Sequence, residues 1–123
     1  MKKFNKLIGN YGEDIALNFV KDKNYKILDK NFRTKKGEID LICKHKEIII
    51  FIEIKSRYSS SLGNPCESVT YFKQKQIINL SNYYIYKFNL YNYNFRFDVI
   101  EIFFNTKDES FIINHIEDAF RTY

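Results

Sequence analysis

The segment over residues 37–57 constrains the fold most, because it carries two apolar runs separated by a short polar stretch. Residues 39–43 and 48–54 are rich in isoleucine, a β-branched residue that favours strands. Residues 44–47 are polar and predict a tight turn, so the segment is typical of a β-hairpin. Because both runs are nearly continuous rather than alternating, we expect a sheet covered on both faces.

Four ionisable residues interrupt this hairpin, and a charge in a buried strand is costly unless it is paired or coordinated. Glu38 and Asp40 lie on the first run, and Glu53 and Lys55 lie on the second. A turn with an even number of residues predicts a register such as Glu38 opposite Glu53, with Asp40 opposite Phe51. Asp40, Glu53 and Lys55 then project from one face. An odd-length loop would divide them between the two faces, unless a bulge restored the phase.

Two interpretations fit this spacing. Two carboxylates on one face supply the oxygen ligands that a hard divalent cation prefers, and Lys55 would then steady a nucleophile or a phosphate oxygen. The alternative is a cross-strand salt bridge on an exposed face, which has no chemical role. The spacing alone does not separate them.

Composition limits the class of protein. A chain of 123 residues with 45% hydrophobic residues predicts one globular domain over residues 1–123. Cys43 and Cys66 lack the spacing of a disulfide framework, and the basic N-terminus lacks a secretory signal, so we expect reduced thiols and a cytoplasmic protein. No apolar run reaches the length of a membrane span. The net charge of +5 permits a polyanionic partner.

The first half of the chain supplies a helix and a strand before the hairpin. Apolar residues at spacings of three and four predict a helix over about residues 5–23. Glu13 lies beside its apolar stripe, where it either points toward the sheet or is an ordinary solvated residue. Residues 25–33 predict a strand, and the polar residues 56–65 predict a loop that begins beside the charged cluster.

The second half predicts a helix over about residues 71–88, with Thr70 as its N-cap. Lys73 and Lys75 lie near the start of this helix, where they form either a phosphate site or a solvated cationic face. Residues 95–104 predict a strand, and residues 110–115 predict a short edge strand followed by a polar tail. His115 has no partner pattern and is expected at the surface.

The order of these elements predicts an α/β fold with a mixed sheet flanked by helices. Within it, Asp40 followed by the Glu-x-Lys of Glu53 and Lys55 resembles the PD-(D/E)XK nuclease superfamily. A wider set of motifs resembles the YraN family of endonuclease-like proteins and, through Glu13, the archaeal Holliday-junction resolvases. These motifs are residues 12–16 (GEDIA), 31–33 (NFR), 37–42 (GEIDLI), 51–57 (FIEIKSR), 63–69 (GNPCESV) and 96–99 (RFDV).

The resemblance implies a restriction-endonuclease-like core and hydrolysis of phosphodiester bonds in DNA, with structured or branched DNA as a candidate substrate. It implies that Asp40 and Glu53 bind Mg²⁺ or Mn²⁺, with the carbonyl of Ile54 as a third ligand. Glu13 would complete the acidic cluster, by analogy with the resolvases. Lys55 would orient or help to deprotonate the attacking water. The role of Glu38 stays open.

Phosphate contacts are expected from Arg33, Arg57, Lys73 and Lys75, which would give sequence-independent binding. A homodimer is a natural arrangement for a protein that makes the two cuts needed at a junction. One alternative is a non-catalytic nucleic-acid-binding module that retains the nuclease fold. Another is an interaction scaffold that uses the many surface tyrosines.

Overall fold

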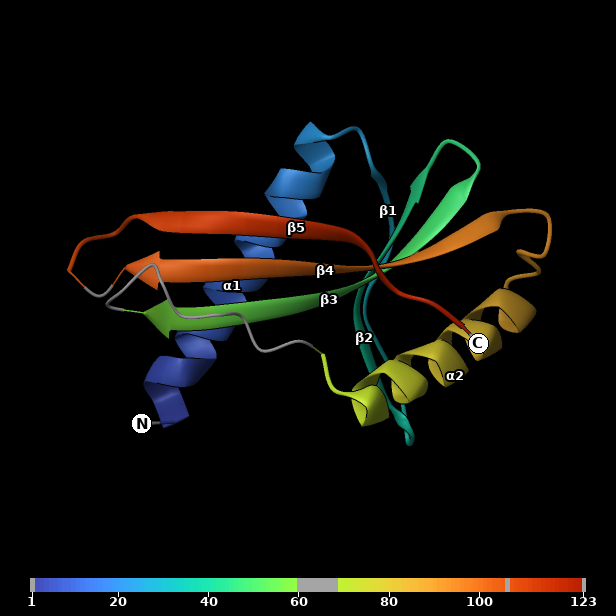
Figure 1. The fold of residues 1–123 in the computed structure, drawn as a ribbon, viewed down its shortest axis with the longest axis horizontal. Helices are drawn as coiled ribbons and strands as arrows, with labels where there is room; N and C mark the ends of the chain where they lie inside the picture. Colours follow the sequence, from blue (N-terminus) through green and yellow to red (C-terminus); the bar gives the residue numbers. More distant parts are fainter. Residues whose placement is uncertain (1, 60–68, 106, 123) are drawn as a thin grey trace.

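The computed structural model describes residues 2–59, 69–105 and 107–122, with side chains from residue 11 onward except at residue 59. Two helices and five strands follow one another along the chain (Figure 1). Their bounds are α1 (Lys2–Asp22), β1 (Lys26–Thr34), β2 (Gly37–His45), β3 (Ile48–Ser59), α2 (Tyr71–Lys87), β4 (Asn94–Asn105) and β5 (Phe111–Phe120).

The strands form one sheet in the order β1-β2-β3-β4-β5. Neighbouring strands are antiparallel except β3 and β4, which run parallel and are connected through α2. The helices α1 and α2 lie on opposite faces of the sheet (Figure 1). The structure therefore confirms the predicted α/β fold, a mixed sheet flanked by helices and consistent with a restriction-endonuclease-like architecture.

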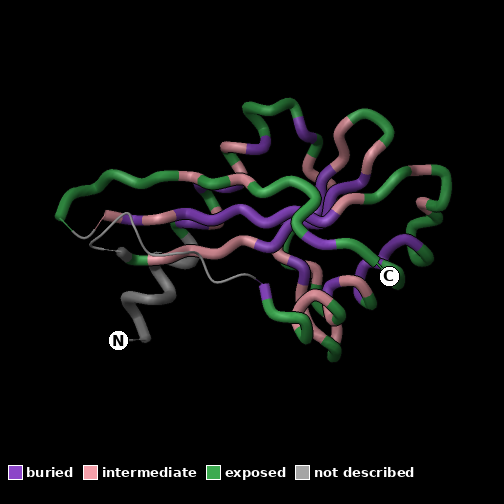
Figure 2. The backbone as a smooth tube through the Cα atoms, viewed as in Figure 1, coloured by how far each residue is buried: buried purple, intermediate pink, exposed green. Residues whose placement is uncertain are grey.

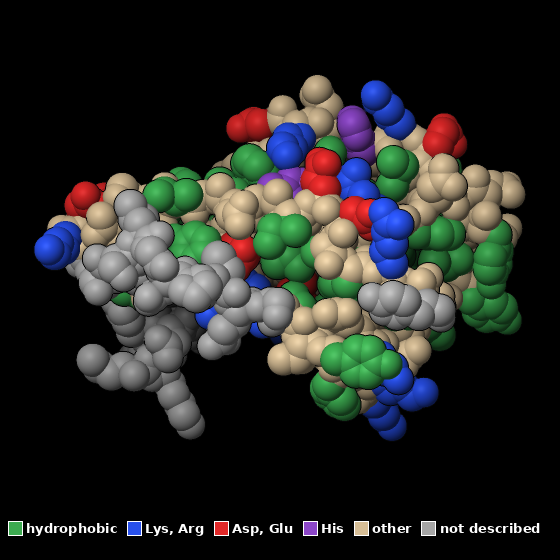
Figure 3. All heavy atoms as spheres, in the orientation of Figure 1, with side chains coloured by type: hydrophobic (Ala, Val, Ile, Leu, Met, Phe, Trp, Pro, Cys, Tyr) green, Lys and Arg blue, Asp and Glu red, His purple; other side chains and the backbone are tan. Residues whose placement is uncertain are grey.

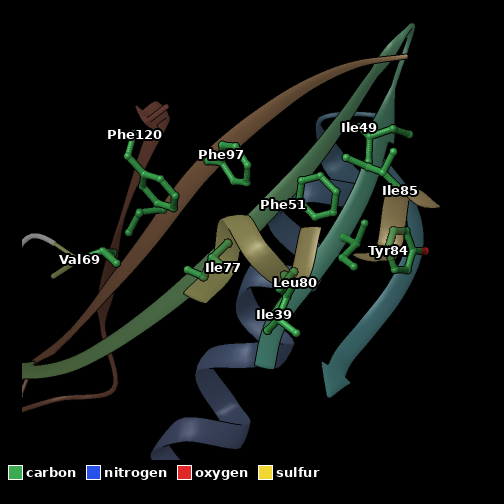
Figure 4. Close-up of a cluster of buried hydrophobic side chains, with 12 residues drawn as sticks. Ile39, Ile49, Phe51, Val69, Ile77, Leu80, Tyr84, Ile85, Phe97 and Phe120 are labelled. Carbon is green, nitrogen blue, oxygen red and sulfur yellow. The ribbon is translucent and has the colours of Figure 1, made fainter. Parts of the chain in front are cut away.

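Each face of the sheet has its own apolar core. On one face, α2 packs Ile77, Leu80 and Tyr84 against strand residues that include Phe51 and Phe97 (Figure 4). On the other face, Ile15, Ala16 and Val20 of α1 pack against the opposite side chains of the strands. The middle of β3 and β4 is buried from both sides (Figure 2). This double cover explains why the central runs are continuously apolar.

The hairpin has a shorter turn than expected. Only Lys46 and Glu47 form the turn, and Leu41 pairs with Ile52, so the example register is wrong by two residues. Glu38 pairs with Arg33 of the neighbouring strand β1, and it does not lie opposite Glu53 as the example register had it. A shift of two residues leaves the paired side chains from Leu41 to His45 on their predicted faces, because side chains alternate with a period of two.

Two strands extend further than the sequence indicated. β3 continues through residues 56–59, which were expected to begin a loop, because these residues pair with β4 up to Asn105. The remainder of that predicted loop, residues 60–65, lies outside the described residues. β5 continues to Phe120 instead of ending at His115, because its later residues still bond to β4, where Phe97 pairs with Phe120.

The described part of the chain contains no helix with the length and apolar character needed to cross a membrane.

Candidate active site

The sheet divides between β2 and β3 at Asp40. The β2–β3 pairing ends at Leu41 and Ile52, whereas the start of β2 remains paired with β1. β3 meanwhile continues along β4, so the two halves of the sheet diverge (Figure 1). At the point of divergence, Asp40 Oδ2 accepts a hydrogen bond from the backbone N–H of Ile54 at 2.8 Å. The carboxylate thus satisfies a donor that is no longer paired with a β2 carbonyl.

Glu53 lies beside Asp40 at this division. Its side chain is on the α2 side of β3, in phase with buried Phe51, and the residue is only 7% exposed. Among the residues that the structure describes, none is a hydrogen-bond partner of its buried Oε2 atom. A buried carboxylate oxygen with no partner is costly, which makes Glu53 the least satisfied acidic group of the site.

The pKa values of both carboxyl groups are raised, chiefly by burial. Burial, followed by the negative charge of Asp40, raises the pKa of Glu53 to about 7. Burial also raises the pKa of Asp40, and the hydrogen bond from Ile54 opposes that rise. With a pKa near neutrality, Glu53 is partly protonated at pH 7. The pair therefore carries less than its full negative charge unless a cation joins it.

The positive charges of two lysines lower the pKa of carboxyl groups in this pair. Lys55 follows Glu53 by two residues on the same strand, is half-buried, and lowers the pKa of Glu53. Lys73 comes from the first turn of α2, and its positive charge lowers the pKa of both Asp40 and Glu53. Its backbone N–H donates to the Oγ1 of Thr70, which confirms the predicted N-cap. The sequence analysis had placed Lys73 among phosphate contacts and had not linked it to the carboxylates.

Glu13 approaches the same carboxylates from α1. Burial and the charges of Asp40 and Glu38 raise the pKa of Glu13, while a hydrogen bond with Asn31 lowers it. A small cleft of about 60 Å³ is lined by Glu13 and Asp40 together with residues of β1 and β3. Gly12 permits this approach, since an added Cβ would lie 3.2 Å from the Cβ of Ser56.

The acidic residues do not form one compact ligand group. Within the described ranges, no three Asp, Glu, His or Cys side chains are grouped so that they could hold one metal ion. Asp40 lies beside Glu53. Glu13, by contrast, faces Asp40 across the small cleft of about 60 Å³ next to α1. Glu38 forms a 3.3 Å ion pair with the largely exposed Arg33, which gives it a partner outside the carboxylate pair.

The expected phosphate contacts come from three elements. Arg33 is on β1, Arg57 is on β3, and Lys73 and Lys75 are on the first turns of α2. The Nζ of Lys75 lies 4.8 Å from the ring centre of Tyr71. Hydrophobic and basic side chains adjoin each other over the N-terminal part of α2 (Figure 3).

A second polar cluster is centred on Asp98 of β4, which is fully buried. Arg96 donates two 2.8 Å hydrogen bonds to its carboxylate, and His115 Nε2 lies 2.8 Å from Oδ2. The expectation that His115 is a surface residue is wrong, because its side chain is 4% exposed. The other ring nitrogen, Nδ1, lies 2.8 Å from Lys23 Nζ and therefore accepts, so Nε2–H donates to Asp98.

Comparison with known proteins assigns the chain to a family. The model of the uncharacterised protein family UPF0102 matches residues 12–102. The chain belongs to the UPF0102 family. A UPF0102 protein of Clostridium perfringens (strain 13 / Type A) is 54% identical over 121 residues, 98% of this chain and 99% of the relative. A relative from Clostridium botulinum (strain Alaska E43 / Type E3) is 52% identical over 122 residues, 99% of this chain and 100% of its own.

UPF0102 is the family designation that corresponds to YraN, so the predicted family membership is confirmed. The UPF0102 match begins at Gly12, next to Glu13, and includes the hairpin, α2 and Asp98. It ends before β5 and therefore excludes His115. The sequence pattern did not indicate two roles: that of Lys73, whose charge lowers the pKa of both carboxyl groups, and that of Asn31, the partner of Glu13. Asn31 had a signal, because it is part of the NFR motif that supports the resemblance.

Proposed function

We propose that this protein is a metal-dependent endonuclease that hydrolyses phosphodiester bonds in structured or branched DNA. The observation that carries the proposal is the buried Oε2 of Glu53, which has no hydrogen-bond partner among the described residues and lies beside a second carboxylate where the sheet divides. A hard divalent cation satisfies carboxylate oxygens directly.

Asp40 and Glu53 are the residues that would hold Mg²⁺ or Mn²⁺, with the Ile54 carbonyl as a third candidate and Glu13 nearby. The absence of a three-residue ligand group within the described ranges is compatible with Mg²⁺, which keeps several of its waters and uses one or two carboxylates. When bound, the cation supplies charge for a phosphoryl oxygen and lowers the pKa of coordinated water.

The chain's own residues would perform the remaining tasks. Lys55 would orient the attacking water and donate to the phosphoryl oxygen as negative charge develops there. The attacking water gives up a proton to solvent as its oxygen forms a bond to phosphorus. The bond from phosphorus to the leaving oxygen breaks, and the leaving oxygen takes up a proton from solvent. Lys73 and Lys75, with Arg33 and Arg57, would hold flanking phosphates. For a DNA substrate we expect the protein in the cytoplasm. Because a junction must be cut twice, we also expect a homodimer.

Cleavage assays test this proposal. Purified protein is incubated with labelled duplex, flap and four-way-junction DNA, with Mg²⁺, Mn²⁺ or EDTA. We expect metal-dependent cleavage that Glu53→Gln and Lys55→Ala each reduce by at least about 100-fold, the scale of a lost electrostatic contact in the transition state. Glu47→Gln, at the exposed hairpin turn, is the matched control and should retain activity. Cleavage that survives both site substitutions would exclude this site.

A non-catalytic DNA-binding module is the second candidate, because the exposed Arg33 and the lysines at the start of α2 could hold phosphates without a metal ion. Calorimetry separates the two functions. DNA binding without any heat of Mg²⁺ or Mn²⁺ binding would support the module, whereas metal binding that Glu53→Gln abolishes would support the enzyme.

A further inference from the structure

A second cleft lies between the β1–β2 turn and α2. It has a volume of about 410 Å³, within the usual range for ligand pockets. We call it the turn–helix cleft, and its lining residues are Thr34, Lys35, Lys36, Asn79, Leu80 and Tyr83. The lining has two cations, no acidic residue, and an aromatic ring, so it suits a ligand that is both anionic and planar.

The two walls of the cleft are held together by a specific contact. Gln76 of α2 donates from Nε2 to the carbonyl oxygen of Lys36 at 2.5 Å. Gly37 makes room for this contact: its φ is +144°, and an added Cβ would lie 2.5 Å from Gln76 Cδ. The turn and the helix are therefore fixed relative to each other, and the cleft is preformed.

Tyr83 provides the planar element. Its ring stacks on Phe32 of β1, with centroids 6.2 Å apart and planes inclined by 27°. The residue remains 48% exposed, so part of the ring is open to a ligand. Packing against Phe32 restricts the ring, which lowers the entropy lost when a second planar group stacks on it.

Lys35 and Lys36 provide the positive charge. Both are exposed residues of the β1–β2 turn, on the opposite wall from Tyr83. Two lysines beside an aromatic ring match the two parts of a nucleotide, since phosphate attracts the ammonium groups and the base stacks on the ring.

The cleft lies along α2 from the candidate active site. Lys73, Gln76 and Tyr83 follow one another at helical spacing, and Lys73 acts on the carboxylates of the site. Ten residues of helix from Lys73 to Tyr83 span about 15 Å at about 1.5 Å per residue. That distance corresponds to about four or five nucleotides of a duplex strand. A DNA strand cleaved at the site can therefore reach the cleft.

We propose that the turn–helix cleft binds an unpaired nucleotide of the substrate, with its base on Tyr83 and its phosphate on Lys35 and Lys36. The inference rests on the proposed function and specifies the substrate as DNA with a single-stranded segment near the cut. In an intact duplex the faces of a base are covered by its neighbours, whereas an unpaired base can stack on an aromatic side chain.

Fluorescence anisotropy in EDTA tests the cleft without requiring catalysis. The probes are a fluorescein-labelled Y-shaped duplex with two unpaired arms and a blunt duplex of equal length. We expect Tyr83→Ala to weaken binding of the Y-shaped probe by about tenfold, the effect of losing one base–aromatic stack, and to leave blunt-duplex binding unchanged. Tyr83→Phe keeps the ring and should bind like the wild type. Tyr86→Ala, which removes a more exposed tyrosine of the same helix, is the matched control.

A crosslinking measurement on the wild-type protein covers the case in which Tyr83→Ala does not fold. The unpaired arms carry 5-iododeoxyuridine, and mass spectrometry of the irradiated complex should identify Tyr83. Equal affinities of wild type and Tyr83→Ala for the Y-shaped probe, or crosslinks confined to other residues, would overturn the inference and leave the nuclease proposal intact. A wild type that neither binds nor cleaves either DNA would overturn the proposed function itself.

Discussion

Glu53 is a buried residue of β3, next to the fully buried Ile52. Its Oε2 has no hydrogen-bond partner among the described residues, and its pKa rises to about 7 because of burial and the neighbouring Asp40. Residues that break a local rule in this way concentrate at functional sites. The cost to stability can be measured, which makes Glu53 the sharpest probe of the site.

The free energy of unfolding should depend on pH through Glu53. Folding raises the Glu53 pKa from 4.5 to about 7, so the folded protein holds this proton more tightly than the unfolded chain. The stabilisation is present at acid pH and is lost as the pH rises through that window. Glu53→Gln does not titrate, so we expect its stability advantage over wild type to grow with pH and to approach about 3 kcal/mol above pH 8.

Urea unfolding at a series of pH values from 4 to 8 checks this prediction. Glu47→Gln, which alters an exposed glutamate at the hairpin turn, should show no such trend. Adding Mg²⁺ at pH 8 should stabilise the wild type and leave Glu53→Gln unchanged, since a bound cation stabilises only the protein that binds it. An advantage of Glu53→Gln that shrinks as the pH rises would contradict the prediction.

At the scale of elements, the Asp98 cluster explains why β5 is longer than its sequence suggested. The Asp98 carboxylate accepts the backbone N–H of Asp118 at 3.0 Å and also binds Arg96 and His115. Arg96 in turn donates to Tyr25 just after α1, at 2.9 Å. These contacts join β4 to β5 and to the end of α1. Hydrogen bonds from His115 and Arg96 outweigh burial and lower the pKa of Asp98.

Asp98→Asn should destabilise the protein by about 3 kcal/mol at neutral pH, because it leaves the Arg96 charge without its buried partner. The loss should shrink in acid, since the stabilisation from a lowered carboxyl pKa is present above the unfolded value of 3.8 and disappears as the pH falls. Thermal unfolding at pH 7 and pH 3 measures both effects. Glu109→Gln, an exposed change in the β4–β5 connection, is the control. If Asp98→Asn lowers the free energy of unfolding at pH 7 by less than about 1 kcal/mol, the cluster does not stabilise the packing of β5 on β4.

At the scale of the whole molecule, the division of the sheet brings residues from distant parts of the chain to one place. Asp40 and Glu53 come from adjacent strands, Glu13 from the first helix and Lys73 from the second. The net charge of +5 is moderate, so binding of DNA must depend on where the cations are rather than on their number. Salt dependence of binding reports the phosphate contacts directly.

DNA affinity of the wild type should fall with salt, and Lys73→Gln should reduce the slope of log affinity against log salt concentration by about one, the effect of losing one phosphate contact. Anisotropy titrations between low and physiological salt measure the slopes. Lys46→Gln, at the hairpin turn, is the matched control and should leave the slope unchanged. Equal slopes for Lys73→Gln and wild type would remove Lys73 from the nucleic-acid interface.

The features that the sequence predicted correctly depend on regular spacing of residues along the chain. The fold class and the helices follow from helical and strand periodicity, which depends on neighbours in the sequence. The common face of Asp40, Glu53 and Lys55 stays a prediction, because the β2–β3 pairing ends at Leu41 and Ile52, before it reaches these residues. The placement of His115 failed because its partners, Asp98 and Lys23, are distant in sequence.

The sequence by itself determined the elements, the family and the set of acidic and basic residues from which a site is built. Only the tertiary structure decided that β2 leaves β3 at Asp40, that Lys73 acts on the carboxylates, and that α2 and the β1–β2 turn enclose a cleft. These features arise where elements far apart in sequence pack together. Their geometry depends on packing across the whole sheet, which no short stretch of sequence specifies.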